Sequence, residues 1–178
     1  PALRVRIHHG GGRAEDAKAF AADARAHDVM ITSYALARRD EALLAAVPWR
    51  RLVLDEAQQI KNPQAAQTRA IRRLRATHRL AMTGTPVENR LLDLWSLFEF
   101  LNPGYLGKEA SFRKTFETPI QRDRDAAQAD RLRKLTQPFV LRRVKTDPTI
   151  IQDLPDKVEQ TLYTPLTPEQ ASLYEAVV

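Results

Sequence analysis

The sequence predicts an α/β fold in which a parallel sheet is flanked by helices and followed by a helical insertion. In the first hundred residues, short apolar runs alternate with longer helical patterns. Strands that alternate with helices form parallel sheets with right-handed crossovers. After Pro103 this alternation gives way to charged helical stretches. We therefore expect the sheet domain at 1–104, the insertion at 105–147 and a connecting segment at 148–178.

Each predicted element has a local signal. Short apolar runs predict strands at 3–8, 28–33, 51–54 and 80–82. Helical patterns between and after them predict helices at 15–26, 35–46, 63–75 and 91–101. Asn62 and Pro63 suit the N-cap and first position of the third helix, and Pro48 ends the second. Further helices are expected at 109–116 and 123–135, and a capping box at 167–170 opens a last one.

Two adjacent carboxylates, Asp55 and Glu56, directly follow the strand predicted at 51–54. Open α/β sheets bind their ligands at the carboxyl ends of the strands. Nucleotide hydrolysis needs two acidic groups there, one that holds Mg²⁺ and one that orients the attacking water. An Asp-Glu pair also occurs at solvated strand ends and helix starts, so this pair alone leaves both interpretations open.

A second polar turn, Thr83-Gly84-Thr85-Pro86, ends the strand predicted at 80–82. Gly84 would allow a sharp bend, with a threonine hydroxyl on each side. If the two strands are neighbours, these hydroxyls lie near the acidic pair. The turn alone is explained as well by an ordinary strand-turn-helix junction with threonine as a local cap. The two segments together favour a nucleotide site.

These segments resemble motifs II and III of the Swi/Snf-type helicase-like ATPases of superfamily two. The resemblance rests on 55–62 (Asp-Glu-Ala-Gln to Ile-Lys-Asn) and on the long stretch 82–103. It continues at 31–34, similar to motif Ib, and at 138–145 and 154–159, similar to a signature that follows the first lobe. It covers nearly the whole chain and is weakest around 105–135. It implies part of an N-terminal RecA-like lobe of the P-loop NTPase type, as in bacterial members, with a helical protrusion and a connection towards a second lobe.

The resemblance also implies roles for the motif residues. Asp55 would hold Mg²⁺ through water, and Glu56 would polarise the attacking water. Four residues correspond to positions that couple nucleotide state to lobe movement: Gln58, Thr83, Gly84 and Thr85. Gln58 stands where many relatives have histidine, and its amide can still donate and accept a hydrogen bond.

Double-stranded DNA is the implied partner, together with the second RecA-like lobe of the parent chain. Thr32 and Ser33 match positions that contact strand phosphates, although they could simply end a strand. The signature after the first lobe contributes three basic residues that could face DNA, nucleotide or the second lobe: Arg142, Arg143 and Lys145. For five further arginines the preferred interpretation is a solvated helix face: Arg69, Arg72, Arg73, Arg75 and Arg79.

The sequence contains no Gly-x-x-x-x-Gly-Lys-Ser/Thr loop, which would hold the phosphates of a nucleotide. ATP and Mg²⁺, the cofactors that the resemblance implies, need such a loop for tight binding. In the family this loop lies upstream, and the arginines that complete hydrolysis lie in the second lobe. The chain opens with Pro1 in mid-pattern, so we expect a piece of a longer protein. The parent protein should hydrolyse ATP, and residues 1–178 alone should be inactive.

Composition limits the other classes of function. A net charge of +6 and a pI near 9.9 suit a polyanionic partner. The absence of cysteine excludes disulfides and thiolate zinc sites. No apolar run approaches the ~18 residues of a membrane span. His8 and His9 point to opposite faces of a strand, which disfavours a shared metal. We expect the protein in the bacterial cytoplasm with the nucleoid, or in the nucleus of a eukaryote, and a nucleoprotein among its targets.

Two other functions stay open. A DEAH-like RNA helicase would share the acidic pair, but the continuation at 94–103 argues against it. A non-catalytic basic module that binds nucleic acid is the second alternative. The presence of both Asp55 and Glu56 disfavours it, because a site that no longer acts has no need of two adjacent carboxylates.

Overall fold

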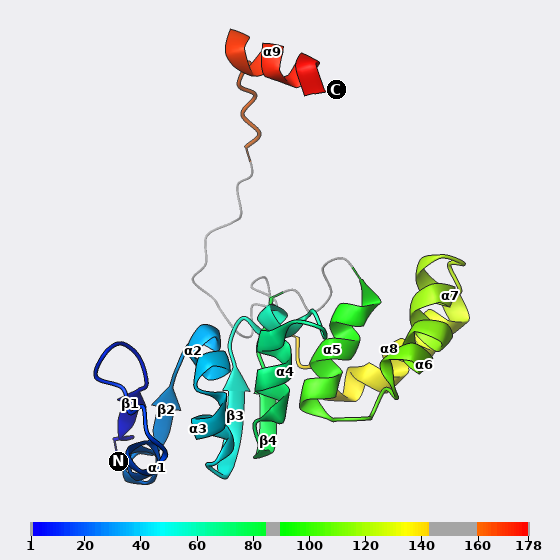
Figure 1. The fold of residues 1–178 in the computed structure, drawn as a ribbon. Helices are drawn as coiled ribbons and strands as arrows, with labels where there is room; N and C mark the ends of the chain where they lie inside the picture. The colour runs from blue at the N-terminus through cyan, green and yellow to red at the C-terminus, as the bar shows by residue number, and fades with distance from the viewer. Residues whose placement is uncertain (1, 85–89, 143–159, 178) are drawn as a thin grey trace. The chain divides into compact units, whose positions relative to one another are not determined.

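The structure is a computed structural model that describes residues 2–84, 90–142 and 160–177. It divides into two units, residues 1–138 and 139–178. The first unit holds the four described strands and helices α1 to α8, and the second holds α9 (Pro168–Val177) (Figure 1). The expected domain boundaries after residues 104 and 147 stay predictions.

The α/β prediction is confirmed, and every described strand pairs in parallel. β1 (Val5–Ile7) pairs with β2 (Val29–Ile31), and β3 (Trp49–Leu54) pairs with β4 (Ala76–Ala81). A single sheet was expected, but within the described residues β2 and β3 belong to different two-stranded sheets. β4 begins four residues earlier than predicted, because the exposed polar residues Thr77 and His78 hide it from an apolar pattern.

The helix predicted at 35–46 is two helices, α2 (Tyr34–Arg39) and α3 (Glu41–Ala45). The break lies at Asp40, whose carboxylate Oδ2 is 2.9 Å from His8 Nε2 and 3.0 Å from Arg13 Nε. These two long-range partners hold the residue at the helix junction. The earlier helix α1 (Ala17–Ala26) agrees with prediction, and Asp16 caps it by accepting from the backbone N–H groups of Lys18 and Ala19.

We expect Asp40→Asn to lower the free energy of unfolding by about 1–3 kcal/mol, because it weakens a charged hydrogen-bonded cluster that is nearly buried. Burial raises the pKa of Asp40, but hydrogen bonds from His8 and Arg13 outweigh it, so the folded-state pKa lies below the ordinary value of 3.8. The stabilisation is therefore present above about pH 4 and is lost as the pH falls below it.

Urea unfolding of the wild type and Asp40→Asn at several pH values measures this difference. Asp130→Asn is the matched control, since Asp130 forms only exposed ion pairs with Arg133 and Lys134. A difference that stays constant between pH 7 and pH 3 would contradict the assignment.

The third predicted helix, with Pro63 as its first residue, begins three residues later, as α4 (Ala66–Arg73). Asn62 instead closes a turn, because its side-chain Oδ1 accepts from the Gln64 backbone N–H at 3.0 Å. A 3₁₀ helix, η1 (Ala57–Ile60), precedes this turn. Asn62 therefore accepts a backbone hydrogen bond as a capping residue would, but this bond stabilises the turn and not the start of α4.

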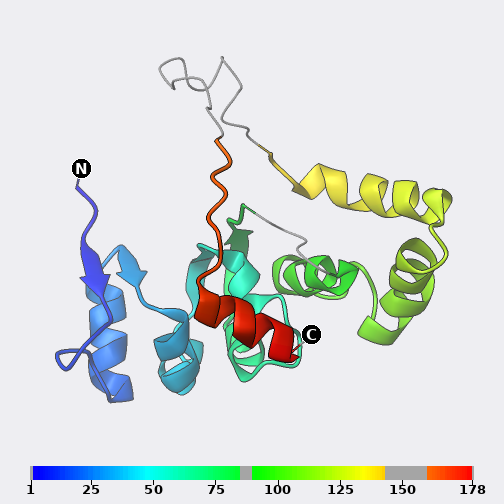
Figure 2. The same cartoon turned by 90° about the horizontal axis from the view of Figure 1, so that it is seen from above.

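Helices α1 to α4 pack on one face of the strands, and Figure 2 shows α1 and α2 on the same side of β1 and β2. The core there includes fully buried Phe20, Ile71 and Leu74, with Leu54 from β3. The opposite face of the strands carries apolar side chains that are about half exposed or more: Val5, Ile7, Ile31, Val53, Leu80 and Met82.

A second core joins α5 (Leu91–Leu101) to the insertion. The insertion holds α6 (Glu109–Phe112), a π-helical segment η2 (Arg113–Glu117), α7 (Thr118–Gln121), α8 (Ala126–Thr136) and η3 (Gln137–Phe139). The prediction at 109–116 is therefore too short, because the helical path continues through η2 to residue 121. Trp95, Phe112 and Phe116 are buried in this core. Tyr105 is 43% exposed, and its hydroxyl donates to the Leu135 carbonyl at 3.1 Å.

In the second unit the capping box is confirmed. The Thr167 backbone N–H donates to Gln170 Oε1 at 3.0 Å, and the Gln170 N–H donates to Thr167 Oγ1 at 3.3 Å. Across all the described ranges, none of the helices has both the length and the apolar character that crossing a membrane would require.

Candidate functional site

The acidic pair lies at the carboxyl edge of the second sheet. Asp55 and Glu56 come directly after β3, and both are exposed. The ladder continues past the strand ends, since the Met82 N–H donates to the Leu54 carbonyl at 2.8 Å and the Ala57 N–H to the Met82 carbonyl at 2.9 Å. This pairing places the start of the Thr83 turn beside the carboxylates.

A chain of side-chain hydrogen bonds joins the two segments. The Thr83 hydroxyl donates to Gln58 Oε1 at 2.7 Å, and Gln58 Nε2 donates to Glu56 Oε2 at 2.7 Å. The amide of Gln58 thus accepts on one side and donates on the other. A change at Thr83 can therefore reach the Glu56 carboxylate through one intervening side chain.

The backbone at the site is strained at Glu56, which has φ 47° and ψ 50°. This left-handed conformation is rare for a residue with a side chain and costs on the order of 1–3 kcal/mol. Gly84 was expected to supply the unusual conformation. It has no positive φ, and a Cβ added there would meet nothing within 4 Å. The unusual backbone conformation at this site is therefore adopted by Glu56 and not by Gly84.

The acidic loop rests on a buried polar support that sequence reasoning missed. In η1, Ala57 and Ile60 are fully buried, and the Ser96 hydroxyl donates to the Ile60 carbonyl. Arg72 Nη2 donates to the Ser96 carbonyl at 2.9 Å and to its hydroxyl at 2.8 Å. The partners lie 24 and 36 residues apart in the chain, so no local pattern could have indicated them.

The solvated-face interpretation is wrong for Arg72 and Arg79. The Arg72 guanidinium stacks on Trp95, and Arg79 donates to the carbonyls of Phe100 and Leu74 at 2.7 and 2.8 Å. Burial lowers the pKa of both arginines. Their donors satisfy carbonyl groups of α5 and the end of α4, so they stabilise the fold beneath the site.

Tyr34, also missed, links the first sheet to the acidic pair. Its hydroxyl donates to the Asp55 carbonyl at 2.7 Å. Burial, followed by the negative charges of Asp55 and Glu56, raises the pKa of Tyr34 to about 12. The phenol therefore stays protonated at neutral pH and remains a donor.

Thr32 and Ser33 lie at the carboxyl end of β2. The Thr32 hydroxyl donates to the His8 carbonyl at 3.1 Å, and Ser33 Oγ accepts from the Leu36 N–H at 3.3 Å as the cap of α2. Arg142 is exposed and belongs to the second unit. The remaining predicted site residues, Thr85, Arg143 and Lys145, lie outside the described residues.

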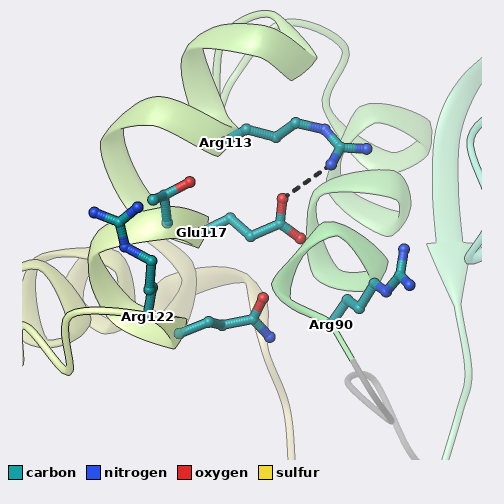
Figure 3. A pocket seen from close by; sticks show the side chains of 6 residues that line it. Arg90, Arg113, Glu117 and Arg122 are labelled. Carbon is teal, nitrogen blue, oxygen red and sulfur yellow. Dashed lines mark hydrogen bonds and ion pairs between the residues drawn. The ribbon is translucent and has the colours of Figure 1, made fainter.

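A separate hollow of about 320 Å³ lies beside the insertion (Figure 3). Arginines line it, but Arg113 pairs with Glu117 at 3.3 Å and Arg122 pairs with Asp123 at 2.9 Å. The hollow is therefore of mixed charge and lies apart from the acidic pair.

Comparisons with known proteins agree with this geometry. The sequence profile of the SNF2-related domain matches residues 1–178. The chain belongs to the SNF2-related domain family. It is 46% identical over 178 residues to the putative ATP-dependent helicase/translocase YwqA of Bacillus subtilis, and this match covers 100% of the chain and 19% of YwqA. It is also 40% identical over 158 residues to the TATA-binding protein-associated factor MOT1 of Saccharomyces cerevisiae, covering 83% of the chain and 8% of that protein.

A solved SNF2 structure is similar throughout. The Sulfolobus solfataricus SWI2/SNF2 ATPase core in complex with dsDNA matches with a TM-score of 0.75 and 43% identity, over 99% of this chain and 36% of that one. A second structure, of the Sulfolobus solfataricus SWI2/SNF2 ATPase core domain, matches with a TM-score of 0.69 and 42% identity, over 98% of this chain and 34% of that one. The chain thus spans only a fraction of the length of its SNF2 relatives.

Proposed function

We propose that this SNF2-related chain is part of an ATP-driven translocase on double-stranded DNA and carries the acidic pair of its hydrolytic site. The hydrogen-bond chain from Thr83 through Gln58 to Glu56, at the carboxyl edge of a parallel sheet, is the observation that carries the proposal. The similarity to YwqA, a putative ATP-dependent helicase/translocase, and to the DNA-bound SWI2/SNF2 core supports the proposal.

The two carboxylates suit different tasks. Asp55 is exposed, and its Oδ1 already accepts from the Glu56 N–H at 2.9 Å, which orients the carboxylate. Such an oxygen donor fits Mg²⁺, which keeps several waters and takes one or two protein carboxylates beside nucleotide phosphates. Mg²⁺, when bound with ATP, neutralises charge that develops on the phosphates. Glu56, held by Gln58, would orient the attacking water.

Gln58 and Thr83 would couple this chemistry to movement. Because Gln58 both accepts from Thr83 and donates to Glu56, a shift of the Thr83 turn changes the orientation of the Glu56 carboxylate. The turn continues into residues that precede α5, which leads to the insertion. Gly84 and Thr85 belong to the same proposed coupling segment.

We expect Thr83→Val in the parent protein to lower DNA-stimulated ATP turnover by up to about tenfold and to leave ATP affinity unchanged, since it removes one hydrogen bond of the chain. Thr83→Ser, which keeps the hydroxyl, is the control. Steady-state ATPase assays with and without DNA measure the effect. Equal turnover by the valine and serine variants would show that the hydroxyl has no part in coupling.

Thr32 and Ser33 are the proposed contacts to DNA phosphates, and Arg142, Arg143 and Lys145 are proposed to face DNA or the second lobe. Hydroxyl and basic groups make such contacts without reading sequence. A basic pI of about 9.9 suits the same polyanion. A protein with this function would act where DNA lies, in the prokaryotic cytoplasm or the eukaryotic nucleus, with nucleoprotein complexes as its targets.

Nucleic-acid stimulation tests the proposal. We expect the parent protein to hydrolyse ATP much faster with duplex DNA than with duplex RNA, and residues 1–178 alone to show no turnover above background. Residues 1–178 contain no phosphate-binding loop, and an arginine supplied by a second element is worth about 10³–10⁵ in turnover in related sites. Preferential stimulation by RNA, or clear turnover by residues 1–178, would contradict the proposal.

A further inference from the structure

Tyr34 connects the two parts of the proposed site, the segment that contacts DNA and the acidic pair. In the chain it directly follows Thr32 and Ser33, and it is the first residue of α2, which Ser33 caps. In space its hydroxyl donates to the Asp55 carbonyl at 2.7 Å, although Asp55 lies 21 residues further along the chain. The same residue therefore belongs to one part of the site and contacts the backbone of the other.

The hydroxyls of Thr32 and Ser33 differ in what they can offer a phosphate. The Thr32 hydroxyl gives its proton to the His8 carbonyl at 3.1 Å. The exposed Ser33 oxygen instead accepts from the Leu36 N–H at 3.3 Å, which leaves its own proton to be donated outward. Phosphate oxygens accept hydrogen bonds, so Ser33 is the better donor to them. The proposed DNA contact thus falls on the residue directly before Tyr34.

The carbonyl that accepts from Tyr34 belongs to the peptide that joins Asp55 to Glu56. The Glu56 N–H, at the other end of the same peptide, donates to Asp55 Oδ1 at 2.9 Å. A trans peptide is rigid, and its C=O and N–H point in opposite directions. One plane therefore carries the Tyr34 hydrogen bond on one side and the hydrogen bond that orients the Asp55 carboxylate on the other.

The orientation of this peptide also sets the backbone of Glu56, which has φ 47° and ψ 50°. Turning a peptide over changes the φ of the next residue, as between β-turns of types I and II, where it is about −90° and about +80°. Glycine adopts the positive value at no steric cost, whereas a residue with a side chain rarely does. A turned-over peptide would relieve Glu56, but its carbonyl would leave Tyr34 and its N–H would leave Asp55 Oδ1. These two hydrogen bonds thus stabilise the left-handed conformation.

The surroundings of Tyr34 fix its hydroxyl in place. Its ring is partly buried and packs against the core that includes Leu54 and Ala57, the residues on either side of the acidic pair in the chain. Burial, followed by the charges of Asp55 and Glu56, raises the pKa of the phenol. Both carboxylates therefore lie near a phenol that stays protonated and can donate at neutral pH.

We propose that Tyr34 is a positioning residue of the acidic pair, which passes the state of the DNA contact at Ser33 to both carboxylates through the peptide that joins them. This step rests on the proposed function. A phosphate bound by Ser33 fixes the first turn of α2 and with it Tyr34, and the Tyr34 hydroxyl then fixes the peptide. Asp55 and Glu56 thereby keep the orientations that their proposed roles require.

Replacing Tyr34 by Phe in the parent protein removes the hydroxyl and keeps the packed ring. We expect kcat for ATP hydrolysis with saturating duplex DNA to fall about tenfold, and turnover without DNA to fall less than about threefold. The KM for ATP and the affinity for duplex DNA should each stay within about twofold, because Tyr34 binds neither ligand in this proposal. Tyr105→Phe is the matched control, since that hydroxyl also donates to a backbone carbonyl, of Leu135 at 3.1 Å, and its loss should leave all four quantities unchanged.

A residue that only supports the fold would lower turnover by the same factor with and without DNA. That result for Tyr34→Phe would overturn the inference, and so would a DNA stimulation equal to that of the wild type. Both results can occur while Glu56→Gln still lowers turnover, so the inference can fail while the proposed function holds.

Thermal unfolding of two further variants of the parent tests the left-handed peptide without any measurement of activity. Glu56→Gly and Glu56→Ala both remove the carboxylate, but only glycine adopts a positive φ freely. We expect the midpoint of the glycine variant to lie about 2 °C or more above that of the alanine variant. Alanine is the more stabilising of the two at ordinary backbone angles, so the reversed order is diagnostic. An alanine variant as stable as the glycine variant would contradict the inference, because Tyr34 would then hold no strained peptide.

Discussion

Replacing Glu56 by Gln in the parent protein should lower ATP turnover by about 10²–10⁴-fold while nucleotide binding persists. The amide keeps the size of the side chain and can still interact with Gln58, which now donates to Glu56 Oε2 at 2.7 Å. It lacks the negative charge that orients and polarises water. The effect should therefore appear in kcat and not in the affinity for Mg²⁺-ATP.

Single-turnover hydrolysis and equilibrium binding of a fluorescent ATP analogue separate these two quantities. Glu15→Gln is the matched control, because Glu15 is an exposed carboxylate that pairs with Arg13. The assignment of Glu56 would be rejected by unchanged turnover in Glu56→Gln, or by a loss of nucleotide binding that accounts for the whole effect.

The largest effect on stability is expected from Phe100→Ala, which should cost about 3–5 kcal/mol. Phe100 is 0% exposed and lies in the same core as Ala57 and Ile60, directly beneath the acidic loop. Its ring also lies 5.2 Å below the guanidinium carbon of Arg79. Truncation leaves a cavity there and removes this contact.

Urea unfolding and ATPase assays on the same samples test this prediction. Phe100→Leu is the control, because it retains most of the buried apolar volume and should cost much less. Since η1 follows Glu56 directly, the alanine variant should also lower kcat at temperatures where it remains folded. A cost below about 1 kcal/mol for Phe100→Ala would mean that this core does not support the loop.

Local patterns predicted the elements well where one signal dominated. The strand before the acidic pair follows from an apolar run, and the capping box at Thr167 follows from short-range hydrogen bonds. Local patterns failed where a residue distant in the chain determined the local structure. Asp40 ends α2 because His8 and Arg13 bind its carboxylate, and no helical pattern contains that information.

The candidate site shows the same division. The sequence predicted that Thr83 lies near Glu56 if their strands are neighbours. The pairing of β3 with β4 shows that they are. Tyr34 and the Ser96–Arg72 support were missed, because each joins residues more than 20 positions apart. Their side chains are ordinary in sequence and acquire a role only through contact.

By itself the sequence determined the class of the fold and the two polar segments, because strand and helix periods and adjacent carboxylates are local properties of the chain. Only the tertiary structure decided which hydroxyl reaches which carboxylate, that Glu56 adopts a left-handed backbone, and that β2 and β3 belong to different sheets within the described residues. These features depend on strand pairing and burial, which bring residues that are distant in the chain into contact. A short stretch of sequence holds no information about such contacts.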